Sequence, residues 1–388
     1  MKTSCTNQDV LAKLVNFDTT TCLPTTDLFD WVCDYLDHPA IRHERFDCGD
    51  GHENVWFETG PSCTDGEGVM LCGHVDTVPA DEPDWETDPR ELVEREGRLH
   101  ARGACDMKGF DAIAINLLRE AAESASSRPL CLLLTHSEEI GTIGAGQFVE
   151  QWPSDRSLPR QVIVGEPTSL RPVRGHKGHL TVRIVVGGSP CHTGFPDEGF
   201  NAILSAQPLL ESLDRLRVEL RDEVNEEGAL FPDVPYPVLN VVRINGGNAV
   251  NIMPEFCTID VGIRLLSSRQ AADFIPRLER SVIWSGLRIT DLPAPGCCTF
   301  TVLNHTPPFN TPENDPFLAT VIRASNSDGS HGVGYGTDAG RLEALGCRSV
   351  VFGPGDIAKA HRANEWIPVD EFERAPDLLR TIISDAPA

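Results

Sequence analysis

Residues 130–139 read Leu-Cys-Leu-Leu-Leu-Thr-His-Ser-Glu-Glu, a short apolar run that ends in two adjacent carboxylates. A continuous apolar run of this length, bounded by polar residues, predicts a strand that is buried on both faces. Similar apolar runs occupy residues 54–58, 68–71 and 161–164. Between them, residues 110–122 and 143–151 carry apolar positions at helical spacing. The sequence therefore predicts an α/β domain whose sheet is covered by helices on both faces.

The pattern changes after about residue 175. Residues 179–186 alternate apolar and polar positions, which predicts a half-exposed strand. The segments that follow predict, in order, a helix at 201–218, strands at 238–244 and 257–265, a helix at 271–282 and a strand at 299–302. The order β-α-β-β-α-β is typical of a ferredoxin-like unit. We therefore expect a smaller domain, residues 176–304, inserted into a larger domain made of residues 1–175 and 305–388.

Composition narrows the class of protein. A chain of 388 residues exceeds what one hydrophobic core usually serves, which favours two domains. The net charge of -25 argues against nucleic-acid and anionic-membrane partners. The sequence contains no apolar run long enough to span a membrane and no signal-peptide pattern at its start. Thirteen scattered cysteines then predict reduced thiols in a cytoplasmic protein.

The two carboxylates that end the opening stretch, Glu138 and Glu139, would repel each other unless a proton or a cation intervenes. An acidic pair arises easily in a chain with 58 acidic residues, but it is less expected directly after a buried strand. If Glu139 binds a metal ion, Glu138 can take a proton from water at that metal and later pass it to the leaving nitrogen. The pair therefore favours a hydrolytic site.

Four further side chains beside short apolar runs could be metal ligands: His74, Asp106, Glu166 and His361. With Glu139 they provide two imidazoles and three carboxylates, a set that suits a pair of Zn²⁺-like ions sharing an activated water. In open α/β sheets such residues gather beyond the carboxyl ends of the strands. Taken singly, each has an ordinary alternative; Asp106, for example, could be a helix N-cap. The cluster as a whole predicts a hydrolase.

Other polar residues could support this centre or bind a substrate. Asp76 follows His74 by two residues, where its carboxylate could receive the second N–H of a metal-bound imidazole. His192, Asn251 and Arg264 lie in the predicted insert. Each of these three could contact an anionic substrate or an oxyanion, and each could equally be structural.

Five motifs, in order and spacing, resemble those of the M20 dinuclear metallopeptidases. They are GHVDTVP at 73–79, GACDMKG at 103–109, SEEIGTIGAG at 137–146, GEPTSLRPVRGHKGH at 165–179 and GPGDIAKAH at 353–361. The fourth motif, with PYPVLNVVRINGG at 235–247 and GIRLL at 262–266, is most similar to the acetylornithine deacetylase branch. The likeness covers nearly the whole chain. It implies a zinc-aminopeptidase-like catalytic domain with a central mixed sheet, and a lid through which members commonly form homodimers.

The resemblance also implies a role for each matched residue. Two divalent ions, zinc or cobalt, would be bound by this set: His74 and Glu166 for one ion, Glu139 and His361 for the other, and Asp106 as the bridge. Glu138 would be the general base and acid, and Asp76 would orient His74. His192 would reach the partner subunit's site and stabilise the oxyanion. Arg264 and Asn251 would contact the substrate's α-carboxylate or reacting group, and Thr337 lies in a Gly-rich stretch, 334–338, that matches a substrate loop of several branches.

The predicted reaction is hydrolysis of the N-acyl amide of a small amino acid, with N²-acetylornithine, an intermediate of arginine biosynthesis, as the first candidate. Within the same class, the alternatives are a succinyl-diaminopimelate desuccinylase, another N-acyl-amino-acid deacylase, and a dipeptidase or carboxypeptidase. A metal-poor binding protein is the alternative from another class. The complete ligand set and the intact Glu138 argue against that last alternative.

Overall fold

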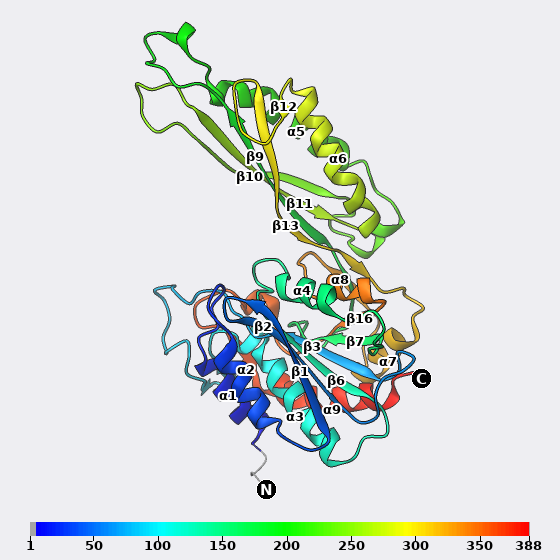
Figure 1. Cartoon of the computed structure of the whole chain (residues 1–388). Coiled ribbons are helices and arrows are strands. Elements are labelled where there is room, and N and C mark those ends of the chain that lie inside the picture. Colours follow the sequence, from blue (N-terminus) through cyan, green and yellow to red (C-terminus); the bar gives the residue numbers. More distant parts are fainter. Residues whose placement is uncertain (1–4, 388) are drawn as a thin grey trace. The chain divides into compact units, whose positions relative to one another are not determined.

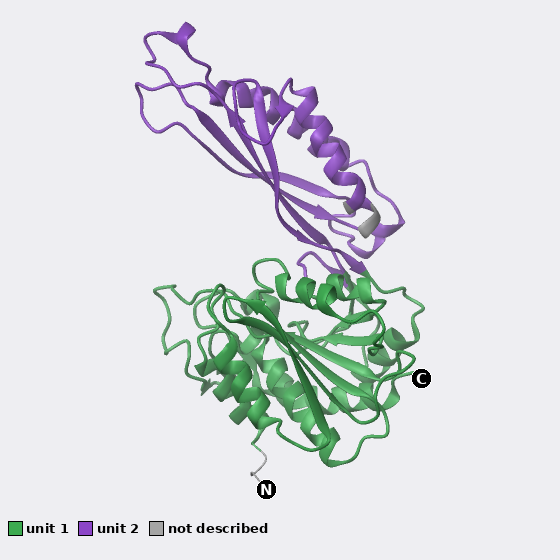
Figure 2. Ribbon diagram, in the orientation of Figure 1, with its two compact units in different colours: residues 1–175, 310–331, 337–388 green, residues 176–309, 332–336 purple. Residues whose placement is uncertain are grey.

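The structure is a computed structural model that describes residues 5–387, except for the side chains of residues 268, 269 and 271. The chain forms two compact units (Figure 2). Unit 1 consists of Met1–Gly175, Asn310–His331 and Thr337–Ala388, and unit 2 consists of His176–Phe309 and Gly332–Gly336. Among the described helices, none is both long and apolar enough to cross a bilayer. All thirteen cysteines are free of disulfides.

Unit 1 is built around the larger sheet (Figure 1). Its strands, in spatial order, are β1 (Ile41–Gly49), β2 (His52–Thr59), β6 (Leu130–Thr135), β3 (Val69–His74), β7 (Gln161–Val164), β16 (Arg348–Val351), β8 (Val173–His176) and β14 (Phe309–Asn310), with β15 (His331–Val333) beside β8. The four central strands β6, β3, β7 and β16 are mutually parallel, and β2 and β8 flank them in antiparallel orientation. The predicted mixed α/β sheet is therefore confirmed.

Helices cover both faces of this sheet. One layer contains α1 (Asn7–Asn16), α2 (Thr26–Tyr35), α3 (Gly109–Glu123), α7 (Pro316–Ser325) and α9 (Val369–Asp385). The opposite face carries α4 (Ile143–Gln151) and the short α8 (Ala339–Leu342). The central strands are buried on both sides, as in β6, where all six residues are inaccessible. This double burial explains the continuous apolar run in the sequence, because neither face of the strand meets water.

Short elements complete unit 1. A small sheet pairs β4 (Val93–Arg95), β5 (Arg98–His100) and β17 (Trp366–Pro368). An irregular turn at Ala104–Lys108 leads into α3, and short 3-10 turns lie at Glu343–Leu345 and Ile357–Lys359. The strand β1 was not predicted, because its solvent-facing residues interrupt the apolar pattern: in IRHERFDCG only Ile41 and Phe46 are buried.

Unit 2 is a mostly antiparallel sheet with two helices on one face (Figure 2). Its elements are β9 (Gly178–Gly187), α5 (Ala202–Leu220), β10 (Val238–Gly246), β11 (Phe256–Leu265), α6 (Ser268–Trp284), β12 (Arg288–Ile289) and β13 (Cys297–Thr306), with 3-10 turns at Pro196–Glu198 and Glu226–Leu230. The spatial order β10-β11-β9-β13 is that of a ferredoxin-like fold. In β9, alternate residues from Leu180 to Val186 are buried against α5 and α6, which matches the predicted half-exposed strand.

Candidate metal centre

The predicted ligands come together at one edge of the unit 1 sheet. His74 is the last residue of β3, Glu139 follows β6, and Glu166 follows β7. His361 follows β16 after a loop of nine residues. Because these four strands are parallel, their carboxyl ends lie at the same edge, where side chains from distant parts of the chain can meet. Asp106 joins them from the turn that precedes α3.

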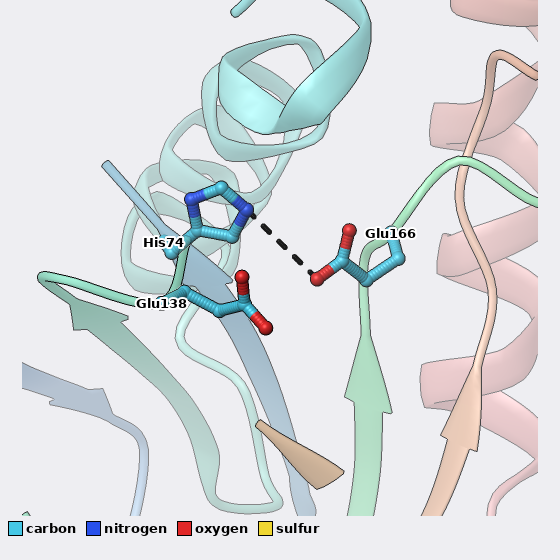
Figure 3. A group of neighbouring side chains, drawn as sticks. All are labelled: His74, Glu138 and Glu166. Atoms are coloured by element: carbon cyan, nitrogen blue, oxygen red, sulfur yellow. Dashed lines mark ion pairs between the residues drawn. The ribbon is translucent and has the colours of Figure 1, made fainter. Parts of the chain in front are cut away.

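His74 is the centre of one ligand group (Figure 3). Its Nε2 lies 3.0 Å from Oδ1 of Asp106 and 3.8 Å from Oε1 of Glu166. His74, Glu138 and Glu166 offer ligand atoms within 4.8 Å of one another, and Figure 3 shows their side chains converging on a common point. His74 and Glu166 could therefore hold one ion, and Glu138 would lie beside that ion.

The second ligand group contains His361. Its Nε2 lies 3.2 Å from Oδ2 of Asp106 and 2.9 Å from Oε2 of Glu139. Asp106 thus turns one oxygen toward His74 and the other toward His361, which is the arrangement required of a bridging carboxylate. The His361 backbone is left-handed, with φ of 57°. The structure therefore brings all five predicted ligands together.

Asp76 ties the ends of β3 and β6 together. Its Oδ1 accepts a hydrogen bond from the backbone N–H of Glu138 at 3.0 Å, and its Oδ2 accepts one from that of Glu139 at 3.2 Å. The His74 Nδ1 lies 3.0 Å from the backbone oxygen of Asp76 and 3.6 Å from its carboxylate. The nearer contact of His74 is therefore the Asp76 backbone oxygen and not the carboxylate that was predicted, while that carboxylate holds the backbone of both glutamates.

The cluster carries an excess of buried negative charge. Burial raises the pKa of Glu138 well above its usual range, and the neighbouring Glu166 adds to the effect. Burial and then the Asp106 carboxylate likewise raise the pKa of Glu166, and they raise that of Glu139 to about 7. For His74, burial would lower the pKa, but hydrogen bonds to Asp106 and Asp76 outweigh it and raise the pKa. These closely packed carboxylates cannot all carry a negative charge unless a positive charge lies between them. Such a set of oxygen donors fits divalent cations.

Several buried acids near the centre were not predicted as site residues, among them Asp338 and Asp111. Asp338, on the N-terminal side of α8, accepts a hydrogen bond from the Thr135 hydroxyl at 2.6 Å, and burial raises its pKa to about 6. Asp111, in α3, packs its carboxyl behind Gly73, where a Cβ would meet Oδ1 at 2.0 Å. The predicted residue Thr337 is buried beside Asp338, and its hydroxyl accepts the N–H of Ala339. It was predicted only through its Gly-rich loop.

His192 and Asn251 lie together in unit 2, on two turns that pair with each other. An isolated bridge joins His192 to Ile252, and the Thr193 N–H donates to the Asn251 carbonyl at 3.2 Å. The His192 Nδ1 accepts the N–H of Gly194 at 3.0 Å, which leaves its Nε2 directed away from the turn. His192 itself is exposed.

Arg264 lies at the end of β11, opposite His179 of β9. Burial lowers the pKa of Arg264, and burial followed by the Arg264 charge lowers the pKa of His179 to about 4. The same two causes lower the pKa of Lys177 to about 8. Within the described residues, no carboxylate pairs with the Arg264 guanidinium. Arg264 is therefore a half-buried cation that suits an anion.

A buried cluster of imidazoles and carboxylates at the carboxyl edge of a mixed sheet defines a metal-dependent hydrolase. Comparison with known proteins specifies the family. The model of peptidase family M20/M25/M40 matches residues 70–385, and the chain belongs to this family. It is therefore a metal-dependent amidohydrolase.

Individual relatives agree with this assignment. The chain is 33% identical over 378 residues to an acetylornithine deacetylase from Myxococcus xanthus, covering 96% of both chains. It is 35% identical over 318 residues to an acetylornithine deacetylase from Proteus mirabilis, covering 82% of this chain and 79% of the relative. Among solved structures, an M20 family metallo-carboxypeptidase from Sulfolobus solfataricus matches with a TM-score of 0.76 at 18% identity, covering 98% of this chain and 99% of the other. That likeness confirms the fold, including the catalytic domain with its insert.

Proposed function

We propose that this enzyme hydrolyses the N-acyl amide of a small amino acid, and that N²-acetylornithine, cleaved to ornithine and acetate, is its substrate. The observation that carries the proposal is the sequence identity to acetylornithine deacetylases across nearly the whole chain. The cluster of His74, Asp106, Glu139, Glu166 and His361 supplies the donor atoms that amide hydrolysis by this family requires. The reaction would belong to arginine biosynthesis and take place in the cytoplasm.

Two divalent ions, zinc or cobalt, would be held by the five ligands, with Asp106 shared between them. When bound, such ions polarise a carbonyl and acidify water. The chain contributes the alignment of the ligands, because Asp76 fixes the ends of two strands at once. The chain also shields the ligands from solvent, since His74, Asp106 and Glu166 are all nearly inaccessible.

Glu138 would be the general base and acid. Its carboxyl lies in the same small group as His74 and Glu166, and burial raises its pKa well above the usual range. A carboxylate with a raised pKa takes a proton from water more readily than an ordinary glutamate does. The same carboxyl can then deliver that proton to the leaving nitrogen. Both transfers use one side chain, so no second acid is needed.

Arg264, Asn251 and Thr337 would recognise the substrate. Arg264 is the strongest of the three candidates, because its half-buried guanidinium faces no carboxylate among the described residues and therefore favours an anion. A free α-carboxylate is the anion that every N-acyl amino acid carries. The guanidinium presents parallel N–H groups that match such a carboxylate.

We further propose that the enzyme is a homodimer in which His192 stabilises the oxyanion in the partner subunit's site. A complementation experiment tests this directly. Glu138→Gln lacks the base, and His192→Ala lacks the oxyanion donor. Mixing the two inactive variants under subunit exchange would create one intact site per heterodimer and restore activity. Failure to restore activity, with exchange verified, would place His192 in its own subunit's site or outside the reaction.

Substrate identity is tested by kinetics on a panel. N²-acetylornithine, N-acetyl derivatives of other amino acids, N-succinyl-diaminopimelate and simple dipeptides would each be assayed with Zn²⁺ or Co²⁺. We expect kcat/KM to be highest for N²-acetylornithine. Turnover of dipeptides alone would refute the deacetylase assignment, and preference for the succinyl compound would assign the enzyme to a desuccinylase.

A further inference from the structure

A buried ion pair, Arg102–Glu365, lies directly behind the ligand cluster. The side chains of both residues are almost inaccessible, at 5% and 1% relative exposure, and the Arg102 Nη1 donates to Glu365 Oε2 at 2.8 Å. The two residues are 263 positions apart in sequence. No ligand role falls to either of them, since neither belongs to the groups around His74 and His361. Their contacts instead connect the loops that carry the ligands.

The first connection reaches the bridging carboxylate. Glu365 Oε1 accepts the backbone N–H of Cys105 at 2.9 Å and that of Asp106 at 3.1 Å. These bonds hold the turn in which Asp106 lies, a turn with irregular backbone angles and therefore without the hydrogen bonds of a regular helix. Because Asp106 faces both histidines, a shift of this turn would change both ligand groups together.

The second and third connections run through Arg102. Its Nη1 also donates to the backbone oxygen of Arg362, the residue after His361, at 3.2 Å. Its Nη2 donates to the backbone oxygen of Pro79, in the loop that follows His74, at 2.9 Å. Glu82 pairs with the same Nη2 at 2.7 Å, and the Trp85 ring packs over the guanidinium. One side chain therefore contacts the loops of His74 and His361, and through Glu365 that of Asp106.

We propose that the Arg102–Glu365 pair is the positioning element of the metal centre, which sets the spacing of the His74, Asp106 and His361 loops before metal binds. This inference rests on the proposed ligand set. Breaking a buried pair leaves an uncompensated charge, so the surrounding loops must rearrange. Hydrogen bonds that orient ligands from behind usually contribute about 10- to 100-fold to metal affinity. The pair would therefore act on binding of metal and only indirectly on the reaction.

The chain provides a matched control. Asp315 is a buried carboxylate in unit 1 whose Oδ1 accepts two backbone N–H groups, those of Phe317 at 2.8 Å and Leu318 at 3.1 Å. Its Oδ2 lies 3.4 Å from an arginine, Arg348, which begins β16 at the end remote from the ligands. Asp315 therefore repeats the contacts of Glu365 without touching a ligand loop.

The experiment compares Glu365→Gln with Asp315→Asn in the full-length protein. Each amide keeps the shape of the carboxylate but cannot accept from both the backbone N–H groups and the arginine, so one set of contacts is lost. Zn²⁺ affinity is measured by competition with a chromophoric chelator, and the melting temperature of the metal-free protein is measured in parallel. We expect both variants to melt a few degrees lower, while only Glu365→Gln binds Zn²⁺ about 10- to 100-fold more weakly.

Several outcomes would overturn the proposal. Unchanged Zn²⁺ affinity in a folded Glu365→Gln variant would assign the pair to stability alone, and so would an equal loss in Asp315→Asn. If Glu365→Gln does not fold, Arg102→Lys provides the test, because a lysine cannot reach Pro79, Arg362 and Glu365 at once. If the wild-type protein binds no divalent ion, the metal centre itself is refuted. That result differs from one in which the wild-type protein binds Zn²⁺ and Glu365→Gln leaves the Zn²⁺ affinity unchanged.

Discussion

The two units bury different chemistry. In unit 1 the interior contains charged side chains next to the apolar core: His74, Asp76, Asp106, Lys108, Asp111, Glu166, Asp338 and Glu365 are all nearly inaccessible. In unit 2 the sheet and its two helices enclose an apolar cluster, and the buried Asp260 is paired with Arg183 and Arg243. Two predicted functional residues of unit 2, His192 and Asn251, are instead exposed on turns, and the third, Arg264, is half-buried on β11.

The contrast between buried charges in unit 1 and exposed residues in unit 2 indicates how each unit can contribute to one reaction. A buried cluster of like charges is costly unless cations or protons neutralise it, so unit 1 couples its own stability to metal. An exposed residue on a turn contributes little to the stability of its unit, so unit 2 can adapt its substrate contacts without losing its fold. Unit 1 should therefore provide the metal ligands and the general base, and unit 2 should provide the contacts to the substrate and to the oxyanion.

Removal of metal should have the largest effect, and the two units should respond to it differently. Stripping divalent ions with a chelator is expected to reduce hydrolysis to background, with recovery on adding Zn²⁺ or Co²⁺. Hydrogen exchange measured by mass spectrometry should increase in the loops that follow β3, β6 and β7, because unneutralised carboxylates repel each other there. Exchange in β9 and β11 should not change. An equal increase in both units would contradict the contrast between them.

Loss of the general base should have the next largest effect. Glu138→Gln removes the proton acceptor but keeps the size of the side chain, so kcat should fall by about 10²- to 10⁴-fold. The metal content, measured by elemental analysis, should stay at the wild-type value. The exposed Glu150, at the end of α4, provides the control, and Glu150→Gln should be fully active. Near-normal turnover of Glu138→Gln would refute the role of this residue.

The sequence predicts which side chains gather at this edge of the sheet because most of them follow a strand whose burial is visible locally. The strand β6 ends at Thr135, shortly before Glu138 and Glu139, and β3 ends at His74. Parallel strands then bring their carboxyl ends together without further information. Contacts that support the ligands leave no such local sign. The Arg102–Glu365 pair joins residues 263 positions apart, and Thr135 meets Asp338 across 203 positions.

The same reasoning explains the elements that the sequence did not predict. β1 lies at the edge of the sheet, and its charged residues Arg42, Glu44 and Arg45 find partners on neighbouring segments instead of in a core. A strand that is stabilised by surface ion pairs carries no apolar period. Periodicity therefore identifies strands only where burial selects their residues.

The pH dependence of stability should reveal the buried charge of unit 1 when metal is absent. In the folded protein, burial and then Asp106 raise the pKa of Glu139 from 4.5 to about 7. Between these values the folded state retains a proton that the unfolded state has lost, so the free energy of unfolding should fall as pH rises, by on the order of 3 kcal/mol for this group. His361, whose pKa rises from 6.5 to about 10 through hydrogen bonds to Asp106 and Glu139, acts in the same direction at higher pH.

The measurement is urea unfolding of the metal-free protein at pH 5 and pH 8. Asp260 of unit 2 has the opposite shift, because its hydrogen bond to Arg183 lowers its pKa below 3.8, so its contribution is already complete at pH 5. With Zn²⁺ bound the trend should weaken or reverse, since metal replaces the protons. A metal-free protein that becomes more stable from pH 5 to pH 8 would contradict the excess of buried negative charge.

The smallest effect should come from Arg264 of unit 2 and should fall on binding of the substrate. Arg264→Met keeps much of the apolar stem but removes the charge, and a hydrogen bond to a charged group contributes about 1.5–3 kcal/mol. We therefore expect KM for N²-acetylornithine to rise about 10- to 100-fold with little change in kcat. Arg243→Met is the control, because Arg243 lies on the adjacent strand β10 and already pairs with Asp260 at 3.2 Å. A loss of kcat in Arg264→Met with unchanged KM would place Arg264 in the bond-breaking step and refute its role in binding the substrate.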